Sequence, residues 1–340
     1  MMNLRRKMQG GRWGVLVMSM GALSLVGLSG CASANYEAGG GHEHHLGMAD
    51  SQPDSQPASQ PASQPASQPA SQPAPMSAEA SEASNAGREL VEQMVAVVGT
   101  MDDLKAMKDV EYTYTYGDAP DGKVDVSTER YVFDGEYSWA RFSKREKLVM
   151  PHLKGELIQG YDGESTWVTL DGVLQEGGML LKMSDFLRKT NYYWLTMMQK
   201  LLDPGTHYAH EGTRTVNGID YDLVRITYGE DVGDVQDTYL LYINPETHLV
   251  DQFLFTVMDF NRAEPSLMKV EYENFGQVML PTKREYADSN WDGEVAEDAA
   301  WTDEICENLK FGNGFTREDF QKPGTTQPAA KSAEASGESM

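Results

Sequence analysis

The sequence predicts a mainly β (α+β) domain: a curled antiparallel sheet of about eleven strands, a half-barrel, with helices covering its concave face. Short segments of alternating apolar and polar residues, separated by Gly, Asn, Asp and Pro turns, recur between positions 110 and 309. One amphipathic helix pattern precedes these segments, and a second helical stretch interrupts them. Strands in hairpin order that must bury one face favour this architecture.

The first expected element is a helix from Leu90 to Leu104. Its apolar residues recur at three- and four-residue steps, with acidic residues between them. The apolar set is Leu90, Val91, Met94, Val95, Val98, Met101 and Leu104. This apolar face is wide, so we expect the helix to lie against the sheet.

Most of the following chain is expected to form strands joined by tight turns. Asp162-Gly163, for example, is a hairpin turn between two strand patterns. Met268, Val270 and Tyr272 alternate with charged residues, which predicts one solvated face. The expected strands cover residues 110–116, 128–134, 137–143, 157–161, 165–170, 208–215, 221–228, 238–243, 250–259, 268–275, 282–288 and 301–309.

The helical interruption runs from Met179 to Leu202. We expect two short helical pieces around Thr190-Asn191, ended by Asp203-Pro204-Gly205. Methionine and aromatic side chains on such a piece make an adaptable apolar surface that can line a ligand cavity. The predicted lining residues are Met179, Leu180, Met183, Phe186, Trp194, Met197 and Met198. The alternative is that the same side chains fill a solid core.

The N-terminus predicts a lipid anchor. Basic residues precede an apolar run of about 16 residues, which is shorter than the roughly 20 that a spanning helix needs. Leu28-Ser29-Gly30-Cys31 then resembles the lipobox of bacterial lipoproteins, in which cleavage precedes a cysteine that receives lipid such as palmitate. Residues 1–30 are therefore predicted to be a signal peptide and Cys31 the acylated first residue. An uncleaved anchor and an ordinary signal sequence cut elsewhere are the alternatives.

Residues 31–86 are predicted to be a disordered spacer. A Ser-Gln-Pro-Ala repeat places proline at every fourth position and offers almost nothing apolar to bury. The tail 323–340 has a similar composition, so the folded domain is expected over residues 87–322. His42, His44 and His45 in the spacer could capture a metal ion loosely, but a glycine-rich tail lacks the support that a stable site needs. A solvated tail is the alternative.

Charge and cysteine content restrict the partners. The chain carries 28 basic and 52 acidic residues, a net charge of −24, and removal of residues 1–30 takes away four more basic residues. Such a charge argues against nucleic acid as a partner. Cys31 and Cys306 are the two cysteines, so acylation of Cys31 leaves Cys306 without a disulfide partner in the chain. We expect Cys306 to be a buried, inert thiol, and we expect no cofactor.

Several strand and turn motifs carry a resemblance to known proteins. Tyr239–His248 resembles the strand–turn–strand hairpin of the lipoprotein-carrier (LolA/LolB-like) family. Leu201–His207, Val216–Gly218 and Gly233-Asp234 resemble a group of uncharacterised bacterial lipoproteins with the same fold. The resemblance implies an incomplete barrel closed by helices over an apolar cavity. It implies no cargo-contacting residue at any particular position.

Catalytic motifs are sparse, so we do not expect an enzyme. His207 and His210 are three residues apart in a strand pattern and should face opposite sides. The loop residues Glu230, Asp231, Asp234 and Asp237 could hold Ca²⁺, but they lack the full order of a calcium loop. A carboxylate-dependent hydrolase would require two acidic side chains to converge in one pocket.

The sequence therefore favours a lipid-anchored envelope binding protein, at the periplasmic face of the outer membrane. It would hold a lipid, a lipoprotein acyl chain or another hydrophobic ligand in the curved sheet. The main alternative is a structural or interaction lipoprotein with a solid core, and the second alternative is the hydrolase.

Overall fold

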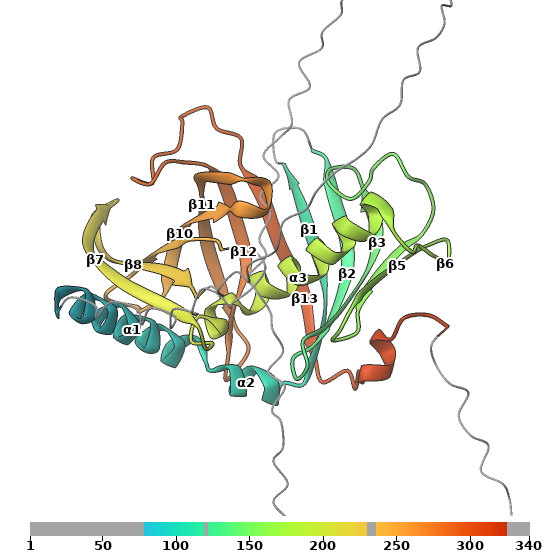
Figure 1. The fold of residues 1–340 in the computed structure, drawn as a ribbon, viewed down its shortest axis with the longest axis horizontal. Coiled ribbons are helices and arrows are strands. Elements are labelled where there is room, and N and C mark those ends of the chain that lie inside the picture. The colour runs from blue at the N-terminus through green and yellow to red at the C-terminus, as the bar shows by residue number, and fades with distance from the viewer. Residues whose placement is uncertain (1–77, 119–121, 230–235, 325–340) are drawn as a thin grey trace, which may run out of the picture. The chain divides into compact units, whose positions relative to one another are not determined.

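The computed structural model describes residues 78–118, 122–229 and 236–324, which form one open, antiparallel, curved sheet with helices against it (Figure 1). The sheet has 13 strands in the order β6-β5-β4-β3-β2-β1-β13-β12-β11-β10-β9-β8-β7. The strands are β1 Asp109–Asp118, β2 Val124–Val132, β3 Tyr137–Arg145, β4 Leu157–Tyr161, β5 Thr166–Leu170, β6 Val173–Leu174, β7 Thr206–Val216, β8 Ile219–Tyr228, β9 Tyr239–Ile243, β10 Val250–Val257, β11 Arg262–Asn274, β12 Met279–Asp288 and β13 Thr302–Phe311. The predicted fold class is confirmed.

The strand order explains why a helix must cross the sheet. The chain begins at the centre with β1 and reaches one edge at β6, yet its next strand, β7, forms the opposite edge. The connection is α3 (Gly178–Lys200), whose 23 residues span about 35 Å at 1.5 Å per residue. Figure 1 shows α3 lying across the concave face, between the part of the sheet with β7 to β11 and the part with β1 to β6.

The strand count and several strand limits differ from prediction. The additional strand, β6, has two residues and is too short to show an alternating pattern. The strand expected to reach position 259 ends at Val257, where a 3₁₀ turn (η1, Met258–Phe260) begins. The next strand starts at Arg262 instead of Met268, since its pairing with β10 extends as far as Val257 and Arg262.

The first predicted helix is two helices in the structure. α1 (Ala78–Val98) ends just before Gly99, whose φ of +90° suits glycine. Thr100 then caps α2 (Met101–Ala106) with a capping box. A Cβ at Gly99 would lie 2.5 Å from the Gln277 carbonyl oxygen. α1 starts at Ala78, nine residues before the predicted domain start at Gly87. The predicted division of the whole chain into signal peptide, spacer, domain and tail remains a prediction.

α3 is one continuous helix, so the prediction of two pieces was wrong. The Thr190-Asn191 pair lies in its buried middle, where packing from the sheet overrides weak helix propensity. Ser184 and Thr196 donate to the carbonyls of Leu180 and Tyr192, four residues back, which keeps their hydroxyl groups bonded within the helix.

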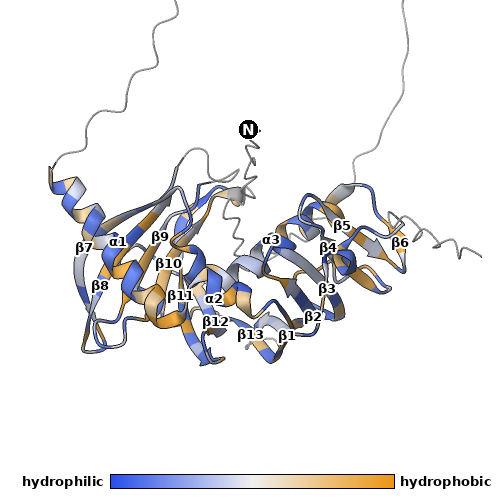
Figure 2. Ribbon diagram, turned by 90° about the horizontal axis from the view of Figure 1, so that it is seen from below, coloured by the Kyte–Doolittle hydropathy of each residue, from blue (hydrophilic) through white to orange (hydrophobic). Residues whose placement is uncertain are grey.

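The concave face of the sheet is covered and the convex face is covered in part. The concave face holds the largest apolar cluster, which includes Trp194 of α3, Phe253 and Phe255. On the convex face, the segment 289–301 packs Trp291 against β8 and β9, and the segment 312–323 buries Phe320 completely. Hydrophobic and hydrophilic residues both occur along the strands in Figure 2, as expected where one face of a strand is buried and the other is in contact with solvent. The predicted solvated side of β11 is confirmed, since Lys269, Glu271 and Glu273 are exposed.

Candidate functional site

A buried ion pair attaches α3 to the sheet. Arg188 of α3 and Glu129 of β2 are both fully buried, and the guanidinium Nη1 and Nη2 donate to the two carboxylate oxygens at 2.5 and 3.0 Å. The third guanidinium bond runs from Nε to Gln159 Oε1 of β4 at 3.1 Å. Ser127 and Tyr131 also donate to Glu129, at 2.7 and 3.1 Å. The pair is therefore bidentate and enclosed in further hydrogen bonds, which is the arrangement that a buried pair requires.

The pKa of Arg188 reflects this setting. Burial opposes the charged guanidinium, but the adjacent Glu129 carboxylate outweighs burial and raises the pKa above its usual value. Arg188 therefore stays charged at physiological pH, and any movement of α3 away from β2 has to break its two hydrogen bonds to Glu129.

A second buried pair lies on the same face, between β12 and β13. Arg284 donates from Nε and Nη2 to Glu304 Oε2 at 3.1 and 2.9 Å, and from Nη1 to the Pro281 carbonyl oxygen at 2.5 Å. Burial opposes the charge of Arg284, yet Glu304 raises its pKa well above the usual value. Cys306, two residues further along β13, shares the concave side with Glu304 and is 3 % exposed.

The Cys306 thiol should react slowly, as predicted for a buried thiol. Burial raises its pKa to about 12, and the thiolate is the reactive form. In the full chain with Cys31→Ser, we expect labelling by a thiol reagent at pH 8 to be at least about a hundredfold slower than in urea. Comparable rates in the folded and unfolded chain would contradict this burial.

A narrow pocket lies between the middle of α3 and strands β1, β2, β3 and β13. It is lined by Tyr114, Tyr116, Asp125, Ser127, Phe142, Leu148, Val149, Phe186, Leu187, Thr190, Asn191, Trp194 and Glu304. Its cavity volume is about 20 Å³. By the same measure a water molecule needs about 10–15 Å³, so one or two waters fit and an acyl chain does not. In this arrangement the space under α3 is nearly filled.

One wall of the pocket is a loop held by Asp125 of β2. Its Oδ1 accepts from the backbone N–H groups of Glu146 and Lys147, and its Oδ2 from those of Leu148 and Val149, at 2.7 to 2.9 Å. Leu148 and Val149 thereby face the pocket. A single buried carboxylate thus holds residues 146–149, the first part of the loop between β3 and β4.

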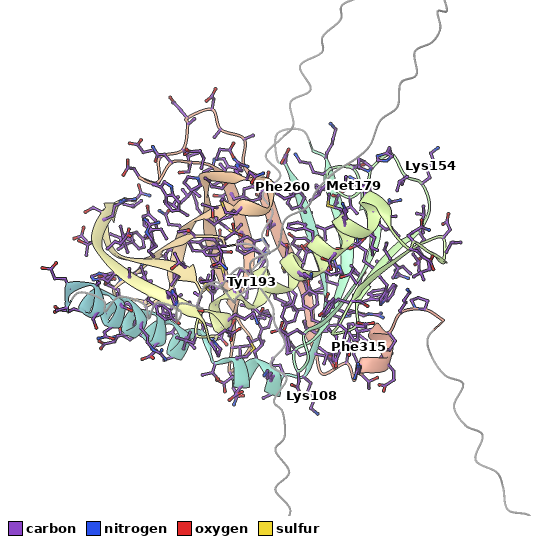
Figure 3. The ribbon with its side chains drawn as sticks, viewed as in Figure 1. Lys108, Lys154, Met179, Tyr193, Phe260 and Phe315 are labelled. Carbon is purple, nitrogen blue, oxygen red and sulfur yellow. The ribbon has the colours of Figure 1, made fainter. Side chains whose placement is uncertain are left out.

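The predicted lining residues lie in different surroundings. Phe186 and Trp194 line the pocket. Met197 and Met198 are buried in the main apolar cluster, and Met183 is in a smaller cluster near β5, with Leu180 packed against it. Met179, at the beginning of α3 in Figure 3, is 65 % exposed. A ligand contact remains a prediction for each of these residues.

The other predicted positions do not form a site among the described residues. His207 and His210 both lie on β7, and His210 Nε2 lies 3.2 Å from Asp222 Oδ1. Asp237 is buried and accepts from the Met258 N–H at 2.8 Å. Within the part of the chain that the structure describes, no cluster of three metal-ligating side chains occurs. The remaining acidic loop residues, the histidine patch and Cys31 lie outside the described residues.

Two carboxylates line the pocket, but three of their four oxygens are engaged in hydrogen bonds. Asp125 accepts four backbone N–H groups, and Glu304 Oε2 accepts two bonds from Arg284. A general acid–base pair would need both groups free to exchange protons with a substrate. This arrangement gives no support to the hydrolase alternative.

Sequence comparison finds a similarity to a family of unknown function. A model described as "Family of unknown function (DUF6503)" matches residues 179–281, which include α3 and β7 to β11. This part is less than half of the chain, so the chain is similar to that family there. No curated protein matches the sequence.

Solved structures are similar to this chain at low identity and with TM-scores below 0.5. A LolA superfamily protein from Nitrosomonas europaea is 12% identical, with 69% of this chain and 97% of that chain covered and a TM-score of 0.45. A DUF1329 family protein from Desulfovibrio piger is 16% identical over 70% and 97% of the two chains, with a TM-score of 0.44. A putative outer membrane lipoprotein-sorting protein domain from Vibrio parahaemolyticus is 10% identical over 69% and 96%, with a TM-score of 0.42. The resemblance predicted from the sequence is found here again, and it concerns the fold alone.

Among the described residues, none of the helices combines the length and the apolar composition that crossing a bilayer requires. α3, the longest of them at 23 residues, has buried polar and charged side chains on the face that packs against the sheet.

Proposed function

We propose that this chain is a lipid-anchored protein of the bacterial envelope, at the periplasmic face of the outer membrane, that holds a hydrophobic molecule between α3 and the concave face of the sheet. The observation that carries the proposal is the pocket under the middle of α3, where Phe186 and Trp194 meet aromatic and aliphatic side chains of the sheet and of the β3–β4 loop. The lipobox at Cys31 supports the anchor.

The size of the pocket determines how a ligand would enter. A volume of about 20 Å³ cannot take an acyl chain, so α3 must move away from the sheet during uptake. α3 is joined to its neighbouring strands through short segments, and polar contacts at Arg188 hold its middle. Ligand binding would therefore be coupled to the opening of α3.

A reversible cross-link tests this proposal. The Thr166 hydroxyl of β5 donates to Asp185 of α3 at 2.6 Å, so a cysteine pair at these positions can join α3 to the sheet. In the full chain with Cys31→Ser, we expect the oxidised Thr166→Cys/Asp185→Cys variant to take up a fluorescent polyene monoglyceride at least about tenfold more slowly. A reductant should restore the rate.

The β7–β8 hairpin provides a matched control. Thr215 and Asp220 are hydrogen-bonded to each other in the same way, so a Thr215→Cys/Asp220→Cys pair creates a cross-link that leaves α3 unrestrained. Its oxidation should not change uptake. If neither the monoglyceride nor the corresponding fatty acid binds to the parent chain, the proposed binding function is wrong.

The alternative role as a structural lipoprotein with a solid core is favoured by one observation, the nearly filled space under α3. Absence of binding together with recovery of an envelope protein by cross-linking would support it.

A further inference from the structure

The polar lining of the pocket is acidic. Its charged members are Asp125 of β2 and Glu304 of β13, and the residues that line it include neither lysine nor arginine. This is unlike a fatty-acid site, in which a cation or free N–H donors would have to compensate a carboxylate in a buried setting.

The two nearby guanidinium groups are already engaged. Arg188 donates to both oxygens of Glu129 and to Gln159. Arg284 donates to Glu304 and to the Pro281 carbonyl oxygen. Both arginines are buried, so turning either toward a ligand would break a buried ion pair.

Three neutral donors of the lining are engaged as well. The Ser127 hydroxyl donates to Glu129 Oε1 at 2.7 Å, and the Asn191 amide nitrogen donates to the same oxygen at 3.3 Å. The Tyr116 and Tyr286 hydroxyls bond to each other at 2.7 Å. Asn191 can therefore offer a ligand its carbonyl oxygen and its second amide N–H, because one N–H already serves Glu129.

Glu304 provides a second acceptor. Both of its bonds from Arg284 go to Oε2, so its other carboxylate oxygen, Oε1, is the one available to a molecule in the pocket. A ligand that enters thus meets an apolar wall of Phe186 and Trp194 and two oxygens that can accept hydrogen bonds, Glu304 Oε1 and Asn191 Oδ1.

We propose that this pocket selects acyl ligands whose polar end is not anionic and donates hydrogen bonds, with an acylglycerol hydroxyl as the model, and that it discriminates against free fatty acids. The inference rests on the proposed function and specifies its ligand class. An acylglycerol hydroxyl can donate to Glu304 or Asn191, whereas a fatty-acid carboxylate would be desolvated beside two carboxylates.

Two probes with the same chain and different head groups test the selectivity. In the full chain with Cys31→Ser at pH 8, we expect a conjugated-polyene 1-monoglyceride to bind at least about tenfold more tightly than the corresponding free fatty acid, as measured by fluorescence titration. Equal affinity, or tighter binding of the fatty acid, would overturn the proposal while leaving the binding function intact. Binding of neither probe would instead count against the binding function itself.

A variant identifies the residue responsible. Glu304→Gln removes one negative charge from the lining and leaves Arg284 without its charge partner, so the preference for the monoglyceride should fall to less than about threefold. Glu307→Gln, at an exposed position of the same strand, removes the same charge and should keep the preference. If the two variants kept the same preference, Glu304 would not be the selecting group. Circular dichroism verifies that both variants are folded, and the unsubstituted chain still decides the proposal if Glu304→Gln does not fold.

Discussion

Replacing Arg188 by alanine should destabilise the domain by about 3–5 kcal/mol, because it leaves the Glu129 carboxylate buried without its partner. Glu129 is fully buried, and the bonds from Ser127, Tyr131 and Asn191 compensate only part of its charge. Urea unfolding followed by tryptophan fluorescence measures the loss as a lower midpoint at an unchanged slope.

Two comparisons make this prediction specific. The Arg188→Met/Glu129→Met double variant removes both charges and should recover most of the lost stability, since a buried pair is often replaceable by apolar side chains. Arg225→Ala breaks the more exposed pair with Glu211 and should cost less than about 1 kcal/mol. An Arg188→Ala variant as stable as Arg225→Ala would show that the pair does not hold α3.

Arg188→Ala should also allow α3 to separate from the sheet more often than the whole domain unfolds. Cys306 lies on the concave face in the cluster that α3 covers, so its labelling rate reports local opening. If labelling increased only in proportion to global unfolding, α3 would not open as an independent unit.

Trp194→Ala should cost about 3–5 kcal/mol and at the same time enlarge the pocket. Trp194 is 2 % exposed, and its ring lies 5.7 Å from Phe253 and 5.4 Å from Phe255, centroid to centroid. Truncation removes these contacts and leaves a cavity that the rigid sheet can only partly fill. We therefore expect lower stability together with faster uptake of the monoglyceride.

The size of the retained side chain separates these two effects. Trp194→Phe should lose less stability than alanine and show a smaller gain in uptake. Trp291→Ala, on the convex face, should change stability without changing uptake. Equal effects of Trp194→Ala and Trp291→Ala on uptake would argue against a binding space under α3.

The strands could be predicted from sequence because their signals are local. The alternation in β1 and the Asp162-Gly163 turn depend on neighbours within a few residues, and the same holds for the solvated side of β11. The helices were predicted less accurately, because their limits depend on contacts with residues that are distant in sequence. Gly99 separates α1 from α2 through a close approach to Gln277, and α3 runs through Thr190-Asn191 because the sheet packs around them.

The polar groups under α3 could not be assigned a role from sequence. Glu129 occupies an inward position of β2 in the same alternation as Asp125 and Ser127, and Arg188 lies in the buried part of α3. A charged residue at a core position is a detectable signal, but its partner lies 59 residues away in sequence. The distance between two such residues is a property of the folded chain.

The sequence by itself determined the class of fold, the alternation of faces and the expected lipid anchor at Cys31, since each depends on residue type and short spacing. Only the tertiary structure decided that the connection between the two edge strands lies across the concave face. It also showed that the space beneath is nearly filled and that its polar lining is acidic. These features depend on which distant side chains pack together, and packing is fixed only when the whole sheet closes around α3.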